Sequence, residues 1–141
     1  MGFNVLIVDD SGAMRKIIKK TIKISGFDVE NFYEAENGKE ALEVLKDKWV
    51  DIVLTDIHMP EMDGISLLKN IREDDVLKGL PIIVISTEGR KKKVQEALNF
   101  GANGYVKKPF KPEEIKNILL QVLGEEYARK EDMGEIPECD F

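Results

Sequence analysis

The sequence predicts a doubly wound α/β fold, a five-stranded parallel sheet with helices on both faces. Five short runs of β-branched and apolar residues alternate with five segments in which apolar residues recur at helical spacing. This alternation is typical of successive βαβ units, whose strands are buried on both faces. The length of 141 residues also supports the prediction, because it suits one compact domain and is too short for two.

Turn residues separate the predicted strands. Asn37-Gly38 and Asp63-Gly64, the latter preceded by Pro60, mark loops or helix starts. The strands are predicted at residues 4–9 (NVLIVD), 31–35 (NFYEA), 51–56 (DIVLTD), 82–86 (IIVIS) and 104–107 (GYVK).

The five helices are predicted from apolar residues at three- and four-residue spacing, which share one face and pack on the sheet. The last helix is expected to begin near Pro112, because proline suits a first helical turn. Trp49, Met59 and Met62 lie outside the helices and are also expected to be packing residues. The predicted core positions of the helices are Met14, Ile17, Ile18, Thr21, Ile22, Ala41, Leu42, Leu45, Ile65, Leu68, Ile71, Val94, Ala97, Leu98, Ile115, Ile118, Leu119, Val122 and Leu123.

Charge and hydropathy argue against two classes of function. The formal net charge of -6 disfavours a nucleic-acid-binding surface, and the one basic run, residues 89–93 (GRKKK), is expected to be the solvated start of a helix. No apolar run approaches the roughly 20 residues that span a bilayer, so we expect no membrane insertion. The N-terminus lacks the pattern of a secretory signal, and a cytoplasmic location is therefore expected.

Residues 125–141 are expected to form an acidic C-terminal extension to a domain of residues 1–124. From Gly124 to Phe141 the chain carries seven acids and two bases, and the helical spacing weakens and then fails. We expect partial disorder and a solubilising role in preference to a docking role, although EIPECDF combines acids with Ile136 and Phe141. The single cysteine, Cys139, is expected to be an exposed reduced thiol.

Polar residues end three of the predicted strands. Asp9 and Asp10 follow the first strand, Asp56 ends the third, and Ser86 ends the fourth. Ligands of an open parallel sheet bind outside the carboxyl ends of its strands. We therefore expect these side chains to converge in one crevice.

Three carboxylates in one crevice favour a bound cation. At about 5 Å and an effective dielectric near 20, each like-charge pair costs roughly 3 kcal/mol, so the site holds either protons or a cation. Hard oxygen ligands with open positions suit Mg²⁺ better than Ca²⁺, and a Mg²⁺ site is expected at Asp9, Asp10 and Asp56. One of Lys107 and Lys108 is expected to face the crevice and attract phosphate, because neighbouring strand residues point to opposite sides.

Four segments carry a resemblance to a known family: VDDS at residues 8–11, DIHMPEMDG at 56–64, IST at 85–87 and GYVKKPF at 104–110. In their order and spacing the chain resembles the receiver domain of two-component response regulators, over residues 3 to 123. The expected subgroup is the stand-alone chemotaxis (CheY-like) type. The resemblance implies the flavodoxin-like strand order 2-1-3-4-5.

The resemblance also implies a role for each matching side chain of the crevice. Asp56 would accept a phosphoryl group as a carboxylate nucleophile and form an aspartyl phosphate. Mg²⁺ would be held by Asp9, Asp10, Asp56 and the backbone carbonyl of His58. Lys108 would pair with the phosphoryl oxygens.

Two further residues match the family's switch. Ser86 would bond the phosphoryl group through its hydroxyl, and Tyr105 would change rotamer with it. This movement would alter a face formed by residues 90–100, Tyr105 and residues 111–123.

The function implied by the resemblance is a phosphorylation-activated signalling switch. The phosphoryl group would come from the phosphohistidine of a sensor histidine kinase. Because no output domain is expected, the signal would leave by binding a downstream target, such as the flagellar motor switch, and a phosphatase is a further expected partner. The chain would be a phosphoacceptor and not an ordinary enzyme, although it would promote its own phosphorylation and slow self-dephosphorylation.

Other functions stay open at this point. A stand-alone receiver can also act as a phosphorelay intermediate or a phosphate sink, or bind partners without being phosphorylated. A Mg²⁺-dependent phosphohydrolase with an aspartyl nucleophile is disfavoured, because His58 stands where a second acid would be needed two residues after Asp56. A flavodoxin-like FMN carrier is disfavoured because acids occupy the place of a phosphate-binding loop.

Overall fold

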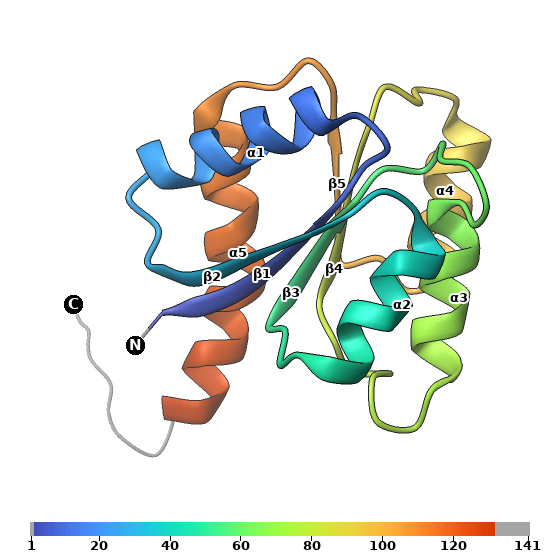
Figure 1. The fold of residues 1–141 in the computed structure, drawn as a ribbon. Helices are drawn as coiled ribbons and strands as arrows, with labels where there is room; N and C mark the ends of the chain where they lie inside the picture. The colour runs from blue at the N-terminus through green and yellow to red at the C-terminus, as the bar shows by residue number, and fades with distance from the viewer. Residues whose placement is uncertain (1, 132–141) are drawn as a thin grey trace.

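The computed structural model describes the backbone of residues 2–131 and the side chains of residues 2–124. Five parallel strands form one sheet in the order β2-β1-β3-β4-β5, which confirms the predicted fold class and strand order (Figure 1). The elements are β1 (Phe3–Val8), α1 (Gly12–Ile24), β2 (Val29–Ala35), α2 (Gly38–Asp47), β3 (Ile52–Thr55), α3 (Gly64–Glu73), β4 (Ile82–Ser86), α4 (Lys91–Asn99), β5 (Gly104–Lys107) and α5 (Pro112–Glu131).

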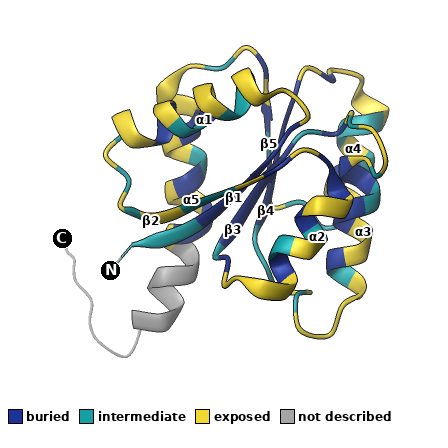
Figure 2. Cartoon of the chain, viewed as in Figure 1, coloured by how far each residue is buried: buried dark blue, intermediate teal, exposed yellow. Residues whose placement is uncertain are grey.

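Two hydrophobic layers cover the sheet, one on each face. Helices α1 and α5 lie on one face and α2, α3 and α4 on the other (Figure 1). The strands alternate between the layers: Leu6 and Val8 of β1 join the cluster under α2 and α3, whereas Val5 and Ile7 join the cluster under α1 and α5. This period of two follows from the pleat of a strand. Both faces of the central strands are therefore buried (Figure 2).

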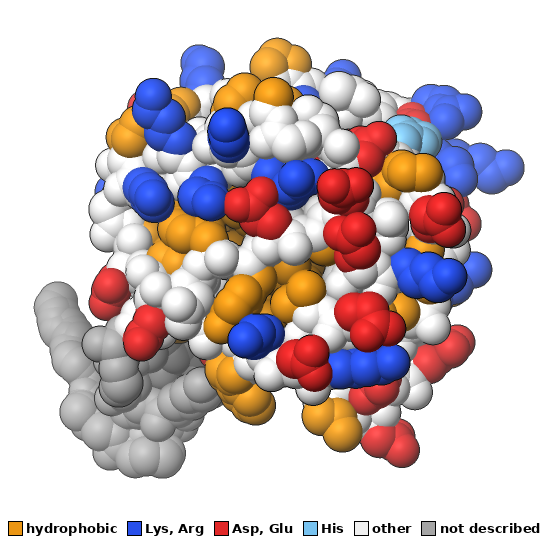
Figure 3. All heavy atoms as spheres, in the orientation of Figure 1, with side chains coloured by type: hydrophobic (Ala, Val, Ile, Leu, Met, Phe, Trp, Pro, Cys, Tyr) orange, Lys and Arg blue, Asp and Glu red, His pale blue; other side chains and the backbone are white. Residues whose placement is uncertain are grey.

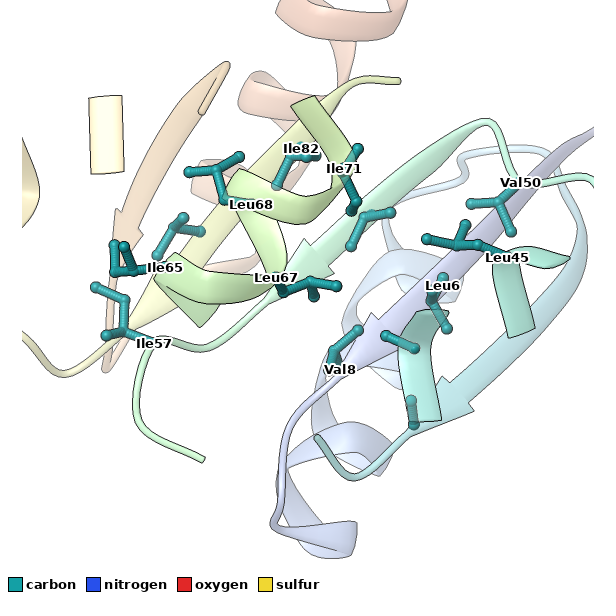
Figure 4. Close-up of a cluster of buried hydrophobic side chains, with 14 of the residues drawn as sticks. Leu6, Val8, Leu45, Val50, Ile57, Ile65, Leu67, Leu68, Ile71 and Ile82 are labelled. Atoms are coloured by element: carbon teal, nitrogen blue, oxygen red, sulfur yellow. The ribbon is translucent and has the colours of Figure 1, made fainter. Parts of the chain in front are cut away.

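The first of these layers is built mainly from aliphatic side chains. Leu67, Leu68 and Ile71 project from α3 toward the strands, and Leu45 projects from α2 (Figure 4). All four are buried, and full burial of each such side chain contributes about 1.5–3 kcal/mol. The helices are thereby fixed against the strands whose carboxyl ends carry the polar residues.

Side-chain caps set the helix starts at the carboxyl ends of the strands. Ser11 accepts a hydrogen bond from the backbone N–H of Met14 and caps α1. Asn37 and Asp63 cap α2 and α3 in the same way. Each cap stabilises its helix by about 1 kcal/mol. As predicted, α5 begins at Pro112.

Three predicted core residues are exposed instead. Ile17 is 50% exposed and Leu98 is 40% exposed. On α1 the buried stripe is centred on Ile18 and Ile22, and Ile17 is rotated about 100° from Ile18 around the helix axis. Trp49 is 76% exposed, because it follows the end of α2 and its indole N–H donates to Asp51 outside the core.

The predicted boundary at residue 124 falls within α5, which continues to Glu131. The extension predicted for residues 125–141 stays a prediction, and its part from residue 132 onward, with Cys139, lies outside the described residues. Among residues 2–131, none of the helices has the length and apolar character needed to cross a bilayer.

Candidate phosphoacceptor site

The acidic crevice forms where two neighbouring strands end. Val8 of β1 pairs with Thr55 of β3, so Asp9 and Asp56 follow directly at adjacent positions. The backbone N–H of Asp56 donates to the carbonyl of Val8 (3.0 Å), which fixes this register at the site. One carboxylate oxygen from each of Asp9, Asp10 and Asp56 lies within 4.8 Å of the other two. The three predicted acids are therefore brought together.

Lys108 is the lysine that enters the crevice. Its Nζ donates to Oδ2 of Asp9 at 2.9 Å and to Oδ2 of Asp56 at 3.0 Å, and its side chain is 9% exposed. Lys107 is exposed on the opposite side of β5, as strand alternation requires. Burial lowers the pKa of Lys108, but its hydrogen bonds to Asp9 and Asp56 outweigh burial and leave the pKa above the ordinary lysine value.

The three acids differ in how many of their oxygens are occupied. Oδ1 of Asp9 accepts from the backbone N–H of Ser11 at 2.9 Å, and Oδ1 of Asp56 accepts from the backbone N–H of Ile57 at 2.6 Å. Their Oδ2 atoms accept from Lys108. Asp10 is exposed, and within the described part of the chain its carboxylate accepts no hydrogen bond. Asp10 is therefore the acid most available to a cation.

The residues present fit a magnesium ion. Three carboxylates and one lysine leave two uncompensated negative charges in a partly buried crevice, which is a costly arrangement without a counter-charge. The donor set is entirely oxygen, and the exposed Asp10 leaves room for water, as Mg²⁺ prefers. A contribution from the carbonyl of His58 stays a prediction.

Gly64 holds the loop that follows Asp56 close to it. Its N–H donates to the carbonyl of Ile57 at 2.8 Å, at the start of α3. A Cβ at position 64 would lie only 2.1 Å from the backbone oxygen of Asp56. Glycine is therefore required here for α3 to approach the acceptor residue.

Glu88 links the opposite lip of the crevice to the predicted switch residues. Its buried carboxylate accepts from the backbone N–H and the guanidinium of Arg90 and contacts Nε2 of His58 at 3.0 Å. Its backbone N–H donates to the hydroxyl of Ser86 at 3.1 Å, and its carbonyl accepts from the hydroxyl of Tyr105. The hydrogen bonds from Arg90, followed by that from His58, hold the pKa of Glu88 well below its ordinary range.

The two predicted switch residues therefore meet at Glu88. Ser86 is fully buried at the end of β4, and Tyr105 is partly buried on neighbouring β5. Burial raises the pKa of the Tyr105 phenol, so its hydroxyl stays protonated and donates at neutral pH. The sequence analysis assigned Ser86 and Tyr105 to the fourth and fifth strands. It did not predict that both contact Glu88, because these contacts are made by the backbone of a loop.

Arg15 supports the site, although the sequence analysis did not single it out. Its Nη1 donates to the backbone carbonyl of Asp9 at 2.6 Å, and its Nε pairs with Glu34 at 2.8 Å. Lys19 contacts the other oxygen of Glu34 at 2.9 Å. Hydrogen bonds from Lys19 and Arg15 lower the pKa of Glu34. This ion pair ties α1 to β2 and supports the backbone at Asp9.

Comparison with known proteins places this geometry in a family. Residues 5–120 match the model of the response regulator receiver domain. The chain is 48% identical over 122 residues to the chemotaxis protein CheY1 of Helicobacter pylori, covering 85% of this chain and 96% of that protein.

Solved structures agree with this match. The chemotaxis response regulator CheY4 of Vibrio cholerae is 34% identical with a TM-score of 0.75, over 86% of this chain and 99% of that one. The CheY chain in a CheX–CheY–BeF3–Mg+2 complex from Borrelia burgdorferi is 36% identical with a TM-score of 0.77, over 86% and 89% of the two chains. The chain therefore belongs to the response regulator receiver domain family, with CheY chemotaxis proteins of two-component signalling among its relatives.

Proposed function

We propose that the chain is a chemotaxis-type signalling switch that accepts a phosphoryl group on Asp56 from the phosphohistidine of a sensor histidine kinase. The observation that carries the proposal is the partly exposed Asp56 carboxylate, held by Lys108 beside Asp9 and Asp10. The Borrelia burgdorferi relative forms a complex that contains BeF3 and magnesium, which supports the same chemistry here. A cytoplasmic location follows from this function.

The acceptor reaction depends mainly on positioning and charge neutralisation. An oxygen of Asp56 attacks phosphorus, the bond from phosphorus to the donor imidazole breaks, and the imidazole nitrogen keeps the electron pair. The N–H of Ile57 holds the Asp56 carboxylate in place. Lys108 already bridges Asp56 and Asp9, and its ammonium group is placed to pair with the incoming phosphoryl oxygens.

Magnesium would be held by Asp9, Asp10, Asp56 and the carbonyl of His58, where it would neutralise charge on the phosphoryl oxygens. The two oxygens of Asp9 are occupied by Ser11 and Lys108, whereas Asp10 is exposed. We therefore propose that Asp10 contacts the metal directly and that Asp9 acts partly through water.

The switch is proposed to act through Glu88. A phosphoryl group on Asp56 carries more charge and more acceptor oxygens than a carboxylate, so it draws the Ser86 hydroxyl toward it. The Ser86 oxygen also accepts from the Glu88 N–H, and the Glu88 carbonyl holds Tyr105. Movement of Ser86 thus displaces the loop at Glu88, which accepts the hydrogen bond from Tyr105 of β5 and leads into α4 at Lys91.

The partners are proposed to bind the face formed by α4, β5 and α5. A downstream protein such as the flagellar motor switch is the expected target, and a phosphatase is proposed as a further partner. The complex of the Borrelia relative with CheX supports binding of a separate protein. His58 bonds to Glu88 through its imidazole and offers no acid for a leaving group, which disfavours a phosphohydrolase.

The test is incubation with Mg²⁺ and a small phosphodonor such as acetyl phosphate, followed by intact-mass measurement. We expect one added phosphoryl group, lost on chelation of magnesium and in Asp56→Asn. Asp75→Asn, which removes an exposed acid far along the chain, is the matched control and should be modified like the natural sequence. Failure to modify the natural chain, or modification that survives in Asp56→Asn, would overturn the proposal.

A further inference from the structure

Two apolar hollows lie at the amino ends of the strands, opposite the acidic crevice. Each has a volume of about 280 Å³, and Phe3 and Leu123 line both. The hollows are therefore adjacent, and we call the two together the basal groove. Its apolar walls include Phe3, Phe27, Trp49, Val76, Leu120 and Leu123.

The rim of the basal groove exposes large apolar side chains. Trp49 is 76% exposed, Val76 is 87% exposed and Leu120 is 49% exposed. Hydrophobic side chains gather at the lower centre of the face drawn in Figure 3, between the start of β1 and the end of α2. A contiguous apolar surface of this kind marks a binding site more often than single exposed residues do.

Trp49 is fixed in position despite its exposure. Its indole N–H donates to Oδ1 of Asp51 at 3.0 Å, and Oδ2 of Asp51 accepts from the backbone N–H of Asn4 at 2.8 Å. The side-chain amide of Asn4 in turn donates to the carbonyl of Trp49 at 2.9 Å. Little conformational entropy is then lost when the ring is covered, which is the property of an aromatic anchor in an interface.

Helix α5 ends on the side of the molecule where this groove lies. Its end lies on the same side of the molecule as the start of β1 (Figure 1). Leu123, which lines both hollows, stands eight residues before Glu131, a helical distance of about 12 Å. The ten residues 132–141 reach at most about 33 Å when extended. They are long enough to fold back across the groove.

The composition of residues 132–141 suits the groove as well. Ile136 and Phe141 supply apolar side chains, which match the apolar walls of the groove. Each hollow is slightly smaller than the roughly 300 Å³ of the smallest typical ligand pockets. It is therefore of a size that single apolar side chains can fill.

We propose that residues 132–141 dock in the basal groove, with Ile136 and Phe141 inserted against Trp49 and Leu123. This intramolecular contact ties the end of α5 to the turns before β3 and β4. It lies at the other end of β1 from Asp9, about 20 Å along a six-residue strand. The proposal is therefore independent of the phosphoacceptor function.

Trp49 is the only tryptophan, so its fluorescence reports directly on the groove. The full chain is compared with a chain ending at Glu131 and with Ile136→Ser/Phe141→Ser, all without phosphodonor. We expect both altered chains to show red-shifted emission and about twofold stronger acrylamide quenching, because the exposed rim of an aromatic anchor is no longer covered. Cys139→Ser is the matched control and should behave like the natural sequence.

A synthetic peptide of residues 132–141 should reverse the change in the truncated chain at about millimolar concentration, the effective concentration that a short tether provides. Equal quenching of the full and truncated chains would overturn the proposal. Shielding of Trp49 that rises with protein concentration, together with a dimer in sedimentation, would assign the groove to a second copy and also overturn it. Phosphoryl acceptance at Asp56 is expected to be unchanged in every variant, so failure of either proposal is recognised separately.

Discussion

The two ends of the sheet place opposite chemistry on the same strands. At the carboxyl ends, Asp9 and Lys108 are buried and Asp56 is mostly buried. At the amino ends the buried residues are apolar, and polar Asp51 serves to hold the exposed Trp49. Burying like charges costs stability, whereas apolar burial provides it. The carboxyl end is therefore arranged for binding and chemistry at the expense of stability.

Among the substitutions that test this contrast, Lys108→Met is expected to change the free energy of unfolding most. Asp9 and Asp56 would lose their shared cation in a buried crevice, and breaking such a pair costs about 3 kcal/mol. We expect the free energy of unfolding, measured in urea without Mg²⁺, to fall by about that amount. Lys107→Met removes the exposed neighbour and should stay within about 0.5 kcal/mol of the natural chain. If Lys108→Met and Lys107→Met lowered the free energy of unfolding equally, burial of the lysine would not determine its contribution to stability.

The pH dependence of stability tests the ion pairs of Lys108 in a second way. Because the pKa of Lys108 is raised in the folded chain, its stabilisation is fully present below the unfolded lysine value of about 10.4. The stabilisation is lost as pH rises through the higher folded pKa. The natural chain should therefore lose stability in this alkaline range more steeply than Lys108→Met.

Much of the fold was predictable because it depends on periodicity, and periodicity is carried by local residue types. The same pattern located Asp9 and Asp56 at strand ends on one edge of a parallel sheet. They meet because β1 and β3 are neighbours, a strand order that the family resemblance implied. Strand alternation left two choices for the lysine, since it fixes opposite sides but not which side is inward; the structure selects Lys108. The link between Ser86 and Tyr105 through Glu88 and the exposure of Trp49 depend on loop conformation, which no periodic sequence pattern predicts.

Asp10→Asn should change the free energy of unfolding less than Lys108→Met does, and should raise it. Asp10 lies within 4.8 Å of the other two acids but is exposed, and Lys108 compensates one of those acids. Removing its charge relieves a net repulsion of about 1 kcal/mol in solvent-exposed surroundings, so stability without Mg²⁺ should rise by that amount. Urea unfolding with and without magnesium should also show that the stabilisation by the metal is lost. A variant that magnesium still stabilises as strongly as the natural chain would remove Asp10 from the metal site.

The smallest expected effect comes from Glu34→Gln, which breaks a charge pair of the same kind at the surface. Glu34 is 34% exposed and pairs with Arg15 and Lys19, and screening by solvent limits its contribution to about 0.5 kcal/mol. The pKa of Glu34 is lowered by these partners, so its stabilisation is present above the unfolded value of about 4.3 and lost as pH falls.

Glu34→Gln should therefore be less stable than the natural chain at neutral pH and equal to it in strong acid, as measured by urea unfolding at both conditions. Glu30→Gln, an exposed change on the same strand, controls for loss of an acid without these partners. If Glu34→Gln cost as much as Lys108→Met, the buried crevice would hold no special electrostatic energy. The contrast between the two ends of the sheet would then rest on composition alone, because ion pairing would be equally strong in the crevice and at the surface.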